Sequence, residues 1–189
     1  MVYISRGEIA SVEKMTVLFR GEEYSLSPKE WEYWKNGLNK FVVVAKSLFS
    51  NNYAMLQSLG EKGLVSLSCQ EVADTNLEKY NLLAKSILVF KPRKVVGMIN
   101  HSELFVVEWL MGASFSLMTE EIVFLVENVI NPTPELLGDK NKQNLVAKIY
   151  PDGKIEDNIL VKRMSGAKRR DFAVSIILSL MKKGYVVLN

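Results

Sequence analysis

The chain has 189 residues, of which 48% are hydrophobic and 24% charged, and its formal net charge is +3. Acidic side chains such as Glu108, Glu120 and Glu127 interrupt the apolar stretches. None of these stretches approaches the roughly 20 uncharged residues that a membrane-spanning helix needs, so no membrane partner is expected. The charged N-terminus shows no secretory signal. A single cysteine, Cys69, cannot form an internal disulfide and fits a cytoplasmic protein.

A β-hairpin is predicted first, over residues 15–26. Residues 15–19 and 24–26 have strand character, and Gly21 lies in the turn between them. A helix should follow at once. Ser27 can act as its N-cap, and Glu30 can complete a capping box.

Two tryptophans, Trp31 and Trp34, give this helix an apolar face. Large aromatic residues at helical spacing belong more often to a core than to a ligand site. We therefore expect both tryptophans to be buried.

A second and a third helix are predicted to complete the first unit. Residues 41–49 form an apolar, weakly helical stretch, and Ser50 can cap a helix over residues 51–61. Gly63 should end that helix, and residues 64–67 alternate into a strand. The order hairpin, three helices and closing strand is that of a winged-helix unit.

An amphipathic helix is predicted over residues 76–89, within a connecting segment at 71–100. The helix either connects two units or supplies a self-association surface. A homodimer and a pseudo-dimer within one chain therefore both remain open.

The sequence repeats itself, because residues 58–68 return as residues 179–189 with six of eleven positions identical. A match without gaps between the segments that begin at Gly21 and Gly112 extends the repeat, and it pairs Glu30 with Glu121. Such repeats define structural units. The second copy carries 30 extra residues between the two matched segments.

The repeat predicts the elements of the second unit. They are hairpin strands at 105–110 and 114–117, a helix at 119–130, a helix at 171–183 capped by Asp171, and a strand at 185–188. Gly184 should end the last helix as Gly63 ends its counterpart.

The predicted fold class is α+β, with two related winged-helix units at residues 1–70 and 101–189. The second unit contains an insertion at 132–163, with a predicted hairpin formed by 144–150 and 155–163. That hairpin is a wing along a duplex, a cover for a sheet edge, or a dimer contact.

Residues 18–32, Leu-Phe-Arg-Gly-Glu-Glu-Tyr-Ser-Leu-Ser-Pro-Lys-Glu-Trp-Glu, resemble the start of the DNA-binding domain of OmpR/PhoB-type response regulators. That resemblance implies DNA binding, although the basic recognition helix and arginine-rich wing of the family are missing from residues 41–68. The whole first unit, closed by Leu56, Leu59 and Gly63, is similar to PqqD-like domains. That similarity implies binding of a peptide at a strand edge.

Charge indicates where DNA would bind. Residues 162–189 carry a net charge of +6, so the remainder of the chain is net −3. Base-reading side chains are scarce on the last helix, so binding would depend on phosphates and on salt. The alternative is an ordinary solvated face. The candidate nucleic-acid-binding residues are Lys162, Arg163, Lys168, Arg169, Arg170, Ser175, Ser179, Lys182 and Lys183.

Catalysis is not expected. The only histidine is His101, and the sequence has no zinc-ligand, phosphate-loop or nucleophile motif. No cofactor or metal is predicted. The predicted function is that of a non-enzymatic, DNA-binding or transcription-associated regulator. The alternative is a peptide- or protein-binding scaffold that uses the strand edge of the hairpin at 15–26.

Overall fold

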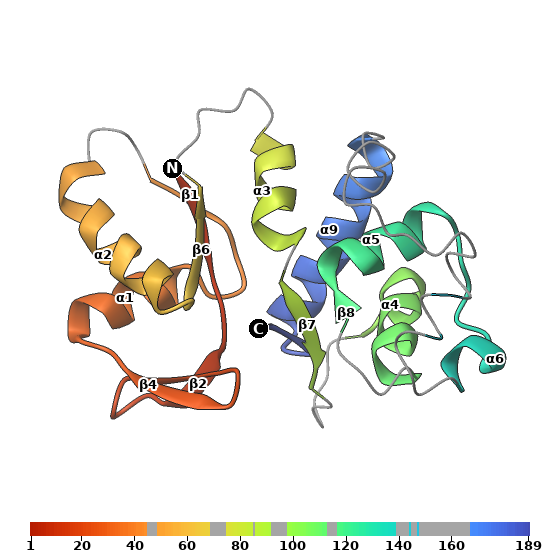
Figure 1. The fold of residues 1–189 in the computed structure, drawn as a ribbon, viewed down its shortest axis with the longest axis horizontal. Helices are drawn as coiled ribbons and strands as arrows, with labels where there is room; N and C mark the ends of the chain where they lie inside the picture. The colour runs from red at the N-terminus through yellow and green to blue at the C-terminus, as the bar shows by residue number, and fades with distance from the viewer. Residues whose placement is uncertain are drawn as a thin grey trace. The chain divides into compact units, whose positions relative to one another are not determined.

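The computed structural model describes residues 1–44, 49–68, 75–84, 86–91, 98–112, 117–138, 144, 147 and 167–189. The chain has an α+β fold and divides into two compact units, residues 1–86 with 187–189 and residues 87–186 (Figure 1). Across these described ranges, no helix is long and apolar enough to cross a membrane.

The first unit is built around two small antiparallel sheets with strand orders β5-β1-β6 and β2-β3-β4. All four residues of β1 are buried, and Figure 1 shows α2 and α3 on opposite sides of this strand. The elements are β1 Val2–Ser5, β2 Glu8–Ser11, β3 Thr16–Phe19, β4 Glu22–Ser25, α1 Pro28–Asn36, β5 Val42–Val43, α2 Phe49–Glu61, β6 Val65–Ser68 and α3 Thr75–Ala84.

The predicted hairpin is confirmed, since β3 and β4 pair antiparallel with Thr16 opposite Ser25. Arg20 and Gly21 both have positive φ angles, of 52° and 86°, as a two-residue hairpin turn of the primed type requires. Strand β2 pairs with the other side of β3. The alternative function predicted above binds a peptide along a free strand edge of the hairpin at 15–26. Because β3 is paired on both sides, the free strand edge of this hairpin among the described residues is that of β4 alone.

The predicted start of α1 is also confirmed. The Ser27 hydroxyl accepts from the Glu30 amide, and the Glu30 carboxylate accepts from the Ser27 amide at 2.9 Å, which is a complete capping box. Trp31 and Trp34 are buried and stack at 5.5 Å between ring centroids. Both belong to the core of the first unit, as expected.

Glycine ends the last helix of each repeat, as predicted. At α2 the Gly63 amide donates to Gly60 and the Leu64 amide to Leu59, and Gly63 has a φ angle of +74°. This pair of bonds is a Schellman motif, which places the C′ residue in the left-handed region.

The prediction of a helix over residues 41–49 is wrong at Val42–Val43, which form β5 opposite Tyr3 and Val2. β-Branched side chains lose rotamer freedom in a helix and pack well on a sheet. Ser50 lies inside α2 and does not precede it. Strands β1 and β2 were not predicted.

The second unit contains β7 and β8 of a small sheet whose strand order is β8-β7-β9, and its helix α9 packs against α4 and α5. The elements that follow α3 are β7 Ile87–Phe90, α4 His101–Gly112, β8 Leu117–Met118, α5 Thr119–Glu127, α6 Pro134–Leu137, α9 Ala167–Lys182 and β9 Val186–Leu188.

The prediction of a strand over 105–110 is wrong, because these residues lie in α4. The exposed side of α4 includes the apolar Leu104 and Met111 beside Glu108, so the sequence of this helix shows little amphipathic helical period. An apolar run of this kind is equally compatible with a strand and with a buried helix.

Two other predicted elements change, and a third falls almost entirely outside the described residues. The helix expected over 76–89 ends at Ala84, and Ile87–Phe90 is the strand β7. Asp171 lies inside α9 and is not its N-cap. The inserted hairpin at 144–150 and 155–163 lies outside the described residues apart from 144 and 147, and these two are helical instead of forming the predicted strand.

The two units repeat one arrangement. After β1, the Arg6 amide donates to Leu64, the residue that follows Gly63; after β7, the Lys91 amide donates to Tyr185, the residue that follows Gly184. Both bonds measure 2.8 Å. Strand β7 therefore corresponds to β1 and α4 to α1, so the match without gaps between Gly21 and Gly112 has the wrong register.

Candidate functional site

A buried glutamate joins the first and last helices of the first unit. The Glu30 carboxylate accepts hydrogen bonds from the Ser58 hydroxyl at 3.3 Å and from Lys62 Nζ at 2.5 Å, both on or directly after α2. Because Glu30 also closes the capping box of α1, one carboxylate stabilises a helix start and a helix–helix contact. We call Glu30, Ser58 and Lys62 the first glutamate clasp.

The second unit contains the same clasp. Glu103 and Asn100 form a capping box at the start of α4, with bonds of 2.9 and 2.8 Å. The Ser179 hydroxyl donates to Glu103 at 2.6 Å, and Lys183 Nζ donates to both carboxylate oxygens at 2.8 and 2.6 Å. Glu103, Ser179 and Lys183 form the second glutamate clasp, so Glu103, and not Glu121, is the partner of Glu30 in the repeat.

Both clasps hold their carboxylates ionised. Burial opposes the charge of Glu30, but hydrogen bonds from Lys62 and Ser27 outweigh burial and lower its pKa to about 2. Burial likewise opposes ionisation of Glu103, and bonds from Lys183, Ser179 and the Asn100 amide lower its pKa below the ordinary value. In each clasp the serine and the lysine donate to the same carboxylate, an arrangement suited to structure and not to nucleophilic attack.

The clasp engages two of the candidate nucleic-acid-binding residues, Ser179 and Lys183. Lys183 Nζ also donates to the Met98 carbonyl at 2.8 Å. Arg170, a third candidate, is only 3% exposed, and its guanidinium pairs with Asp171 at 3.0 Å. These three side chains are therefore committed to contacts within the second unit.

The remaining candidates are placed differently. Arg169 is exposed and donates to the Glu127 carbonyl at 2.7 Å, Ser175 is exposed and donates to the Phe172 carbonyl, and Lys182 is exposed near the end of α9. Lys168 lies in the first turn of α9. Lys162 and Arg163 lie outside the described residues.

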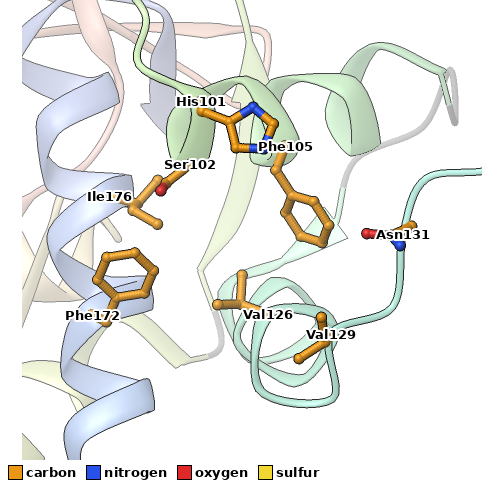
Figure 2. A pocket seen from close by; sticks show the side chains of 8 residues that line it. All are labelled: His101, Ser102, Phe105, Val126, Val129, Asn131, Phe172 and Ile176. Atoms are coloured by element: carbon orange, nitrogen blue, oxygen red, sulfur yellow. The ribbon is translucent and has the colours of Figure 1, made fainter.

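An apolar groove of about 240 Å³ lies between α4, α5 and α9 in the second unit. Figure 2 shows the rings of Phe105 and Phe172 on opposite sides of the groove, with Val126 between them. Phe172 is 50% exposed although it is a large aromatic residue. The groove is lined by His101, Ser102, Phe105, Val126, Val129, Asn131, Phe172 and Ile176.

The apolar lining is specific to the second unit. Aligning Glu103 with Glu30 pairs Phe105 with Glu32. Extending the alignment of residues 179–189 with 58–68 toward the N-terminus pairs Phe172 with Asn51. Glu32 is exposed on α1. The first unit has charged or polar residues at these two positions, and its described residues include no helix between β5 and α2 that corresponds to α5.

The groove also contains a strained residue. Helix α5 ends in a Schellman motif like those of α2 and α9, with the Val129 amide donating to Val126 and the Ile130 amide to Leu125. The C′ residue here is Val129, with a φ angle of +54°, where the other two helices have glycine. A β-branched residue is strained in this region, and such strain concentrates at functional sites. Val129 is 66% exposed, so burial does not explain its presence.

A partly buried acid lies beside the groove. One carboxylate oxygen of Glu127 is buried without a described hydrogen-bond partner. Burial raises the pKa of Glu127, while the charges of Arg169 and Arg170 oppose that shift. The same helix end thus contains both an unfavourable backbone angle and an incompletely bonded carboxylate.

Sequence reasoning missed the groove because its walls come from three helices that are distant in the chain. One local signal was present, since Asn100 and Glu103 have the spacing of a capping box and predict a helix where a strand was expected. His101, the chain's single histidine, is exposed at the first position of α4 and lines the groove.

The described residues include no group of three or more histidine, cysteine or acidic side chains that could hold a metal ion. Comparisons of the chain with family models, with curated proteins and with solved structures found no match.

Proposed function

We propose that this chain is a non-enzymatic protein-binding module of two winged-helix-like units, and that the groove of the second unit is its contact site. The observation that carries the proposal is the exposed apolar groove at α4, α5 and α9, in which Phe105 and Phe172 stand where the first unit has polar residues. Concave apolar surfaces with a few polar groups at the rim are typical binding sites. Exposed aromatic residues are typical anchors of protein contacts.

Selection of peptides from a random phage-displayed library on the purified full-length chain tests this proposal. We expect enrichment of a consensus peptide that binds the wild-type protein with a Kd in the micromolar range. The Phe172→Asn variant, which carries the residue of the first unit, should lose that binding. Met111→Asn should keep it, because Met111 is 56% exposed on α4 but does not line the groove. Failure to enrich any peptide that depends on Phe172 would contradict the proposal.

DNA binding along α9 is the second candidate function. It is supported by the exposed cations Arg169 and Lys182 and by the net charge of +6 in residues 162–189. We rank it second because Arg170 and Lys183 are engaged by Asp171 and Glu103.

Fluorescence anisotropy with random duplex DNA across a salt series separates the two candidates. DNA binding predicts micromolar affinity that falls steeply with salt and is lost when Lys168, Arg169 and Lys182 are replaced by alanine. The protein-binding proposal predicts that these replacements leave peptide affinity unchanged. Absence of duplex binding at low salt would exclude the DNA candidate.

A further inference from the structure

We propose that the groove of the second unit accepts one aromatic side chain, with a polar tip, from an extended or helical segment of a partner protein. This inference rests on the proposed function and specifies the chemistry of the residue that is bound.

The size of the groove favours one large side chain. Small-molecule sites usually enclose roughly 300 to 1,000 Å³, whereas this groove measures about 240 Å³. A single large side chain from a surface that covers the groove fits this space better than an independent ligand would. Affinity would then come from the anchor together with the contacts of the segment that carries it.

The walls favour an aromatic ring. Phe105 on α4 and Phe172 on α9 present rings from opposite sides, and Val126 lies between them (Figure 2). Aromatic pairs gain energy beyond burial when a ring meets another in an offset or edge-to-face arrangement. A ring inserted here meets two aromatic partners, whereas an aliphatic side chain gains only burial.

The rim favours an anchor with a polar tip. His101, Ser102 and Asn131 line the groove beside the apolar walls, and the His101 and Asn131 side chains are exposed. These groups include hydrogen-bond donors and acceptors. A tyrosine hydroxyl or a tryptophan indole N–H can therefore be satisfied at the rim while the ring lies between the phenylalanines.

Strained backbone lies at one exposed edge of the groove. Val129, at +54° in φ, lines the groove where glycine ends the corresponding helices. Asparagine or glycine would relieve the strain but would remove apolar surface from the groove. The presence of valine at this position is explained if its side chain contacts the bound residue.

A titration with small probes, followed by the methyl resonances of Val126, Val129 and Ile176 of the full chain, tests the inference. N-acetyl-tyrosinamide and N-acetyl-tryptophanamide should shift these methyl resonances saturably with a Kd near the millimolar range. N-acetyl-leucinamide should bind at least ten-fold more weakly. Phe172→Asn should abolish the shifts, and Met111→Asn should leave them unchanged. Equal shifts with the leucine probe, or no saturable shift with any probe, would overturn the inference.

The phage-selected peptides separate failure of this inference from failure of the proposed function. Peptides that depend on Phe172 and contain an essential tyrosine or tryptophan support both. Peptides that depend on Phe172 but are anchored by leucine, isoleucine or methionine refute the aromatic anchor and leave the binding function intact. If no peptide depends on Phe172, the proposed function itself fails.

Discussion

The two units of the chain share one structural device and differ at one surface. In both, a glutamate that caps the first helix also binds a serine and a lysine of the last helical segment, and glycine ends that last helix. The groove side differs, because Phe105 and Phe172 of the second unit correspond to Glu32 and Asn51 of the first. The shared clasp is explained by folding, whereas the apolar groove, which α5 also lines, is the surface to which we assign the proposed binding function.

The clasps should respond differently to loss of their glutamate. Glu103 has a side chain that is 1% exposed, against 12% for Glu30. Removing one partner of a buried ion pair leaves the other charge unpaired. We therefore expect Glu103→Ala to lower the unfolding free energy by about 3 kcal/mol. Glu30→Ala should cost about 2 kcal/mol, because its contacts are more solvated. Urea unfolding measures both, and a larger loss for Glu30→Ala would contradict the comparison.

Acid should weaken the first clasp at a defined pH. The pKa of Glu30 is lowered from 4.5 to about 2 in the folded chain, so its stabilising effect is fully present above pH 4.5. That contribution is lost as the pH falls through the interval from 4.5 to about 2. Unfolding free energies of wild type and Glu30→Gln, measured across this interval, should converge at low pH. Parallel curves would show that the Glu30 carboxylate is not the titrating group.

The three Schellman ends provide a matched test of backbone strain. At α2, alanine in place of Gly63 must adopt a φ of +74° and brings its Cβ to 3.0 Å from Phe19. We expect Gly63→Ala to destabilise by about 2 kcal/mol. Gly21→Ala is the control, since φ is also positive there but a Cβ meets nothing within 4 Å, so its cost should be about 1 kcal/mol.

At the C-terminal end of α5, beside the groove, a substitution is expected to raise the unfolding free energy instead of lowering it. Val129→Asn places a residue that tolerates the left-handed region at the C′ position, so we expect it to stabilise the protein by about 1 kcal/mol. The same change should weaken peptide binding, because it removes apolar surface from the groove. Thermal unfolding and peptide titration of one preparation measure both effects, and a destabilised variant would contradict the strain argument.

The smallest expected effect on folding is that of Phe172→Asn. Because Phe172 is half exposed, its replacement should change the unfolding free energy by only about 0.5 kcal/mol. The variant should nevertheless lose peptide binding, while Met111→Asn, with a similar change in exposed apolar surface, should not. Unfolding of Phe172→Asn at a much lower urea concentration would indicate a structural role for this residue.

Features set by local chemistry could be predicted from the sequence. The capping box at Ser27 and Glu30, the turn at Gly21 and the helix ends at Gly63 and Gly184 each depend on a few neighbouring residues, and all are confirmed. The repeat of residues 58–68 at 179–189 also matches the structure at both helix ends.

Features set by distant contacts could not be predicted in the same way. The apolar run at 105–110 carries no period that separates a strand from a buried helix, so the capping box at Asn100 and Glu103 is its one local sign of a helix, and the packing of α4 against α9 completes the distinction. The contact between Lys183 and Glu103 joins residues 80 positions apart, so the sequence could not show that this cation is already paired. The groove likewise exists only once α4, α5 and α9 are assembled.

The most direct test of the central claim is an amide chemical-shift map of the full chain, titrated with a phage-selected peptide that contains an essential aromatic residue. We predict saturable shifts at α4, α5 and α9 around Phe105, Val129 and Phe172, with α1 and α2 of the first unit unchanged. Shifts concentrated instead on α1 and α2, or along the edge strand β4, would contradict the claim that the second unit's groove is the binding site.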